Sequence, residues 1–112
     1  MQHIIGIEYV VKVHSPIYLN KERREKVVVA LKRYMEKLET ENGNDWVELN
    51  EIQSSTAAFK LSLLRPKELH WEEVQGIREI IRQTLRSEEH LEQGKTVSVD
   101  VYQPSSNVSA FC

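Results

Sequence analysis

The sequence predicts an α+β fold in which two helices cover one face of a four-stranded antiparallel sheet. Two observations support this prediction. Four segments alternate apolar and polar residues with the period of two typical of half-buried strands, and two longer segments repeat apolar residues with the period of an amphipathic helix. The six segments follow the order strand, helix, strand, strand, helix, strand, over residues 3–13, 21–41, 46–52, 56–64, 68–87 (or 71–87) and 96–102.

The first strand is predicted from regular alternation. From Ile5 to Val13 its odd positions are apolar, whereas Gly6, Glu8 and Lys12 are among the even ones. Pro16 then ends the strand, because proline has no N–H to donate to a neighbouring strand. The residues expected to face the core are Ile5, Ile7, Tyr9, Val11 and Val13.

The first helix is expected to begin after Asn20, a residue type that caps helix N-termini well. Asn42 and Gly43 follow its last turn, and both tolerate the left-handed conformation common at helix C-termini. The apolar stripe of this helix consists of Val27, Val28, Leu31, Tyr34, Met35 and Leu38.

A hairpin is expected next, because two strand-like segments flank the polar stretch 53–55. The first of them, 46–52, alternates weakly. The second, 56–64, alternates clearly until Arg65 and Pro66, with Ala57, Phe59, Leu61 and Leu63 on one face.

The second helix and the last strand follow the same rules. The helix has its apolar face at Val74, Ile77, Ile81 and Leu85. A turn at 93–95 leads to the strand, in which Val97, Val99 and Val101 alternate with polar residues and Tyr102.

This order of elements is the split βαβ arrangement called ferredoxin-like, with both crossovers right-handed. We expect one domain over residues 1–103 and a polar tail over 104–112. The fold hosts many unrelated functions, so it implies none by itself. The core predicted for it comprises Ile7, Tyr9, Val11, Val28, Leu31, Met35, Phe59, Leu61, Val74, Ile77, Ile81, Val97 and Val99.

Composition narrows the classes of protein. The 112 residues include 15 Lys or Arg and 17 Asp or Glu, and the formal charge of -2 argues against a strongly basic nucleic-acid module. Cys112 is the single cysteine, so no internal disulfide can form. The longest apolar run spans residues 27–31, too short for a membrane helix, and the N-terminus does not resemble a signal peptide. We therefore expect a cytoplasmic protein with no membrane contact.

Catalytic and cofactor signatures are weak. The open face of the two central strands is expected to have no aromatic residue for stacking RNA bases, and the glycines are scattered rather than clustered around a phosphate. His70 and Glu73 lie three residues apart, which makes half of a zinc site at most. We expect no metal, no cofactor and no enzymatic activity. The enzymatic alternative rests on His14, in the loop after the first strand, as its acid–base group.

A possible anion site is suggested by the charges of the first helix. Residues 21–26 carry four positive and two negative charges, and 36–41 carry three negative and one positive, which opposes the helix dipole at both ends. Arg23, Arg24 and Lys26 are therefore candidate ligands for a phosphate or a nucleic-acid backbone. A ridge on the second helix, formed by Arg78, Arg82 and Arg86, adds to this candidate site.

The open face of the sheet favours a different function. Ile4, Val10, Leu64 and Tyr102 are expected there among polar residues, and the tail adds Phe111. We therefore interpret the chain as a small binding or regulatory module that acts through protein–protein contacts, with a homo-oligomer or another protein as partner. Binding of an anion or nucleic-acid backbone is the first alternative, and a small enzyme is the second.

Overall fold

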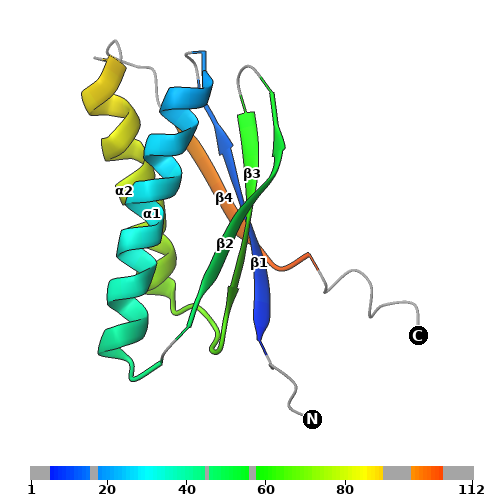
Figure 1. Cartoon of the computed structure of the whole chain (residues 1–112), viewed down its shortest axis with the longest axis vertical. Coiled ribbons are helices and arrows are strands. Elements are labelled where there is room, and N and C mark those ends of the chain that lie inside the picture. The colour runs from blue at the N-terminus through cyan, green and yellow to red at the C-terminus, as the bar shows by residue number, and fades with distance from the viewer. Residues whose placement is uncertain (1–5, 16–17, 45, 56–57, 90–96, 105–112) are drawn as a thin grey trace.

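The structure is a computed structural model that describes residues 6–15, 18–44, 46–55, 58–89 and 97–104. Strands β1 (Ile7–His14), β2 (Glu48–Ser54), β3 (Ala58–Arg65) and β4 (Ser98–Tyr102) form one antiparallel sheet in the order β2-β3-β1-β4. Helices α1 (Lys21–Glu41) and α2 (Trp71–Glu89) lie side by side on one face of this sheet (Figure 1). The chain thus has the ferredoxin-like βαββαβ topology, and the predicted fold class is confirmed.

The hairpin differs from its prediction. β2 continues through Ser54 into the stretch that we expected to be a turn. The pairing of β2 with β3 shifts between Glu51 and Gln53, so a β-bulge accommodates the extra residue. The predictions for residues 3–5, 16, 56–57, 93–96 and 105–112 lie outside the described residues.

The core lies between the sheet and the two helices. β3 alternates strictly between half-buried and buried residues, as the period of two predicts. Most of the predicted core is confirmed, but Ile7, Val28 and Val74 are only half-buried. In α1, Val27 faces the core, four residues before Leu31. The sequence has three consecutive valines at 27–29, so it did not reveal which of them would be buried.

Local contacts define the ends of α1. The side chain of Asn20 accepts a hydrogen bond from the Arg23 N–H at 2.8 Å, as expected of an N-cap. After the last turn, Gly43 has a φ of 81°, a conformation that costs glycine little. Both ends therefore form as the sequence predicts.

β2 is an exposed edge strand. Leu49 is its only half-buried residue, and Ile52 is 53% exposed. Glu48, Glu51 and the bulge make this edge a poor template for pairing with another strand. Within the described ranges, neither helix has the length and hydropathy needed to cross a bilayer.

Candidate functional site

A buried ion cluster joins β3 to both helices. Arg65, the last residue of β3, is 1% exposed. Its Nε lies 2.6 Å from Glu39 Oε2 of α1, and its Nη2 donates to Glu39 Oε1 at 3.2 Å. Its Nη1 lies 3.0 Å from Glu73 Oε1 of α2. One arginine thus holds two carboxylates from two different helices.

Two members of the cluster, Arg65 and Glu73, have pKa values shifted toward their charged forms. Burial opposes ionisation of Glu73, but hydrogen bonds from the His70 N–H and from Arg65 hold the pKa of Glu73 below its ordinary value. Burial also opposes the charge on Arg65, and its bonds to Glu39 and Glu73 outweigh this effect and raise its pKa. Because the carboxylates are engaged with Arg65, the cluster suits a structural role better than a catalytic one.

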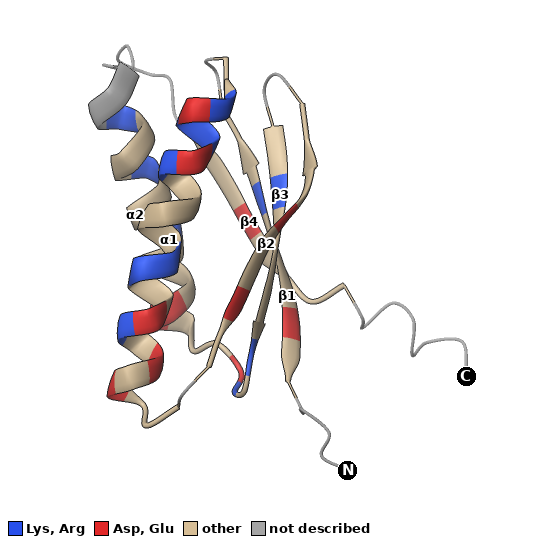
Figure 2. Ribbon diagram, in the orientation of Figure 1, with Lys and Arg blue, Asp and Glu red and all other residues tan. Residues whose placement is uncertain are grey.

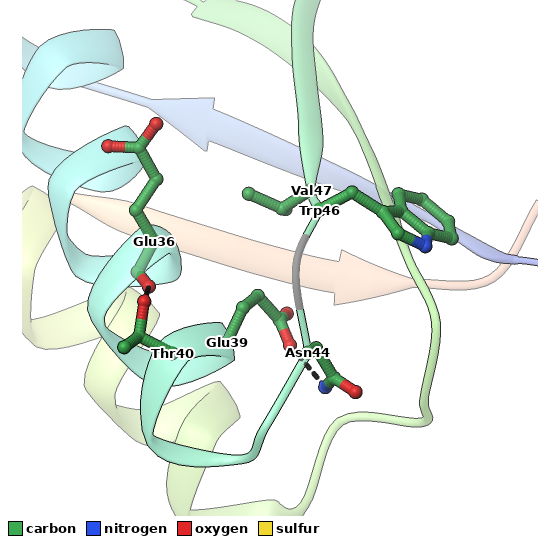
Figure 3. A pocket seen from close by; sticks show the side chains of 6 residues that line it. All are labelled: Glu36, Glu39, Thr40, Asn44, Trp46 and Val47. Atoms are coloured by element: carbon green, nitrogen blue, oxygen red, sulfur yellow. Dashed lines mark hydrogen bonds between the residues drawn. The ribbon is translucent and has the colours of Figure 1, made fainter.

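A cavity of about 420 Å³ opens beside the cluster, between the end of α1 and the segment that leads into β2 (Figure 3). Its polar groups bond mainly to one another: Asn44 Nδ2 donates to Glu39 Oε1 at 2.7 Å, and the Thr40 hydroxyl donates to the Glu36 carbonyl at 2.9 Å. The Trp46 indole and the Glu36 carboxylate point away from these groups in Figure 3. The cavity therefore has no set of free polar groups that converge on one ligand.

Tyr34 lies between the helices near this cluster. Burial raises the pKa of its phenol, and the nearby Glu73 carboxylate adds to the effect. The phenol packs against Gly76 of α2, where the absence of a side chain leaves room for the ring. This close approach positions the two helices relative to each other.

At the start of α1, the predicted anion-binding arginines already have partners. Arg23 Nη1 donates to the Tyr18 carbonyl and Arg24 Nη1 to the Leu19 carbonyl, each at 2.7 Å. Arg24 Nε also lies 3.2 Å from Glu51 Oε2 of β2. These contacts fasten the loop before α1 and the edge strand, while anion binding at this place stays a prediction.

The three arginines of α2 have different surroundings, and their role as an anion-binding ridge stays a prediction. Arg82 Nε donates to the Val97 carbonyl at 3.2 Å, so this side chain lies against the segment before β4. Arg78 Nε is buried and has no hydrogen-bond partner among the described residues. Arg86 is exposed. Lys26 lies elsewhere, in a groove between the two helices.

That groove runs along the solvent side of the helix pair. Two cavities of about 440 and 390 Å³ form it, and they share Ala30 and Arg33. Thr84 lines the first cavity and Ile80 the second, so the end of α2 lies beside the start of α1. Val29 on the α1 side is 48% exposed.

Exposed charges of opposite sign border the groove. The α2 charges are spaced by seven residues, about two helical turns, so they form one line. The exposed charges at its border include Glu22, Glu25, Lys26, Arg33 and Lys37 on α1 and Arg86, Glu79 and Glu72 on α2. Within the described part of the chain, Arg33 and Lys37 form no ion pair with Glu72 or Glu79. The seven-residue spacing was the signal in the sequence that could have revealed this surface.

The candidate catalytic and metal-binding histidines lie in different parts of the fold. His14 is exposed at the end of β1, opposite Ala58 and Ser98 of the neighbouring strands. His70 is exposed before α2, and its backbone N–H donates to Glu73 at 2.9 Å. In the ranges that the structure describes, no three His, Cys, Asp or Glu residues converge as metal ligands would.

Comparisons with known proteins add resemblances of fold only. No protein-family model matches the sequence, and no curated protein matches it. A de novo designed protein with a ferredoxin fold is 14% identical, with 87% of this chain and 84% of that chain covered and a TM-score of 0.47. A conserved protein of unknown function from Bacteroides thetaiotaomicron, described as a possible oxidoreductase, is 16% identical, with coverages of 90% and 99% and a TM-score of 0.39. At these identities and TM-scores, neither neighbour indicates what this chain does.

Proposed function

We propose that this chain is a non-enzymatic binding module that pairs with a second copy of itself through the solvent side of its helix pair. The observation that supports this proposal is the opposite charge of the two helices at matching heights. Glu22 lines the same cavity as Thr84, which precedes Arg86 by two residues, and Glu22 and Arg86 are exposed without an ion-pair partner in the described part of the chain.

The charges suit one particular symmetry. A two-fold axis parallel to the helices would place α1 of one copy against α2 of the other, because such an axis exchanges the two sides of the pair. Arg33 would then face Glu79 of the second copy, and Lys37 would face its Glu72. Because the axis is two-fold, each of these ion pairs would form twice in the dimer. Exposed Val29 would lie near the centre of the interface, where apolar contact contributes most.

The available area is adequate for association of moderate strength. Helices of 21 and 19 residues are each about 30 Å long, and two side by side are about 20 Å wide. Two copies could therefore bury roughly 1,200 Å², near the lower limit of stable protein interfaces. Exposed ion pairs contribute only about 0.2–1 kcal/mol each, so they determine which surfaces meet more than how tightly they bind.

This interface differs from the one that the sequence suggested. We expected self-association through the open face of the sheet, but most of its described residues are polar or charged. The apolar Val10 on that face is only 5% exposed. A binding role and a cytoplasmic location remain part of the proposal.

Sedimentation equilibrium at tens of micromolar tests the proposal. We expect a dimer for the wild type and a monomer for Arg33→Glu/Lys37→Glu, in which acids would face Glu72 and Glu79. Lys60→Glu/Lys67→Glu is the matched control, since it changes the net charge equally and neither lysine belongs to a helix, and it should remain dimeric. A wild type that sediments only at 13.1 kDa, or a control that dissociates while the helix variant does not, would overturn the proposal.

A further inference from the structure

Two lysines face each other on the sheet, away from the helices. Lys12 of β1 and Lys60 of β3 are paired residues in the register of these strands, and the blue segments of β1 and β3 lie next to each other in Figure 2. Both are half-buried, and neither has an ion pair or a side-chain hydrogen bond within the described residues. Like charges directly opposite each other destabilise a sheet, so this pair is an unfavourable arrangement without an anion.

A cavity of about 180 Å³ lies at these two lysines, where the β2–β3 hairpin ends. The bulge in β2 places Gln53 opposite Lys60, so the Gln53 amide joins the wall on the same side of the sheet. Ser54 and Ser55 complete the polar part of the wall. The Ser55 hydroxyl already donates to the Ala58 carbonyl at 3.1 Å. Two ammonium groups and one amide thus remain as side-chain donors around one small space, because Ser54 pairs with the inward-facing Phe59.

Carboxylates do not line this cavity. The nearest acid in the same row is Asp100, which pairs with Lys12 in the register from the β4 side, away from Lys60. No ion pair connects Asp100 with Lys12 among the described residues. Among the described residues that line the cavity, the two lysines are therefore the charged groups, and Asp100 lies beside Lys12 outside it.

We propose that this cavity binds a small tetrahedral oxyanion of the phosphate class. Such an anion accepts several hydrogen bonds at once and carries close to two negative charges at neutral pH, which matches two lysines. Lysine binds phosphate as a mobile point charge, so the two ammonium groups can converge on one ligand. The site is independent of the proposed dimer, because it lies on the opposite side of the sheet from the helices.

Titration with inorganic phosphate, followed by amide chemical shifts, tests this site. We expect saturable shifts confined to residues around Lys12, Gln53 and Lys60. Lys12→Gln/Lys60→Gln should weaken binding at least tenfold. The matched control Lys21→Gln/Lys32→Gln removes two exposed lysines of α1 and should bind as the wild type does.

A second measurement keeps the test valid if a variant folds poorly. Phosphate should raise the thermal midpoint of the wild type, because a ligand of the folded state stabilises it. The Lys12→Gln/Lys60→Gln variant should lack this gain, yet without phosphate it should be at least as stable as the wild type. The proposal would be overturned if sodium chloride at the same ionic strength caused equal shifts. It would also be overturned if phosphate stabilised the wild type and the Lys12→Gln/Lys60→Gln variant equally, or if that variant were less stable than the wild type without phosphate.

Discussion

The phenol ring of Tyr34 occupies the space in which a side chain on Gly76 would begin. A Cβ atom at position 76 would lie 2.6 Å from Cζ of Tyr34, closer than non-bonded carbon atoms approach. Because Tyr34 belongs to α1 and Gly76 to α2, this contact sets how closely the two helices pack. It lies near the ion cluster that joins the same helices to β3, because the charges of Glu73 and Arg65 both act on the Tyr34 phenol.

Gly76→Ala should therefore destabilise the protein, although alanine normally favours a helix by about 1 kcal/mol over glycine. The methyl group must displace the Tyr34 ring, and overpacking of this kind costs roughly 1–3 kcal/mol. Urea denaturation measures the difference. In the background of Tyr34→Ala, the same change should be neutral or stabilising. A gain in stability from Gly76→Ala alone would show that the ring moves away freely.

Replacing Arg65 by methionine should be among the most damaging single changes. It leaves the Glu39 and Glu73 carboxylates buried without their cation, and breaking a buried ion pair in this way costs roughly 3–5 kcal/mol. Lys32→Met, at an exposed position of α1, is the control on the surface and should change the free energy of unfolding by less than about 0.5 kcal/mol. The loss for Arg65→Met should shrink in acid, where protonated carboxyl groups need no partner. A loss independent of pH would contradict this explanation.

Stability should fall at alkaline pH because of Tyr34. The folded protein holds the pKa of this phenol above its ordinary value of 10.0, so the unfolded chain loses the proton first. The contribution to stability is complete below pH 10 and is lost as the pH rises through the folded pKa. Tyr34→Phe should thus lose less stability than the wild type between pH 9 and 11, as measured by urea denaturation. Identical losses would show that the phenol does not titrate differently on unfolding.

In acid, the dependence of stability on pH has the opposite sign. The pKa of Glu73 is lowered in the folded protein, so its contribution to stability is present above its ordinary value of 4.5 and is lost as the pH falls through the folded pKa. Glu73→Gln should therefore flatten the fall in the free energy of unfolding on acidification below pH 5. An unchanged acid profile would contradict the assigned role of Glu73.

Periodicity was sufficient to predict the fold, because apolar residues such as Tyr9 and Leu31 recur with the spacing of their elements. Charged residues were harder to place. Arg65 continues the inward-facing positions of β3, and Glu73 shares the inner face of α2, yet neither was included in the predicted core, because charged residues rarely lie in a core. The alternation of side chains along a strand could have identified Arg65 as inward-facing, since Arg65 follows Leu63 by two residues.

The candidate surfaces depended on information that the sequence does not contain. Lys12 and Lys60 are 48 positions apart, and only the register of β1 against β3 places them opposite each other. Arg33 and Glu79 lie level only because of how the two helices pack. Arg24 was interpreted as an anion ligand, whereas its Nε lies 3.2 Å from Glu51 of the edge strand.

The most direct test of the proposed function is to mix two charge-reversed chains. Arg33→Glu/Lys37→Glu and Glu72→Lys/Glu79→Lys should each be monomeric alone, because like charges then meet across the two-fold axis. An equimolar mixture should dimerise, since the acids of the first variant then face the lysines of the second on both sides of the interface. Sedimentation at low salt should show this mixed dimer, and added salt should weaken it. A mixture that stays monomeric while the wild type dimerises would contradict pairing through the helices.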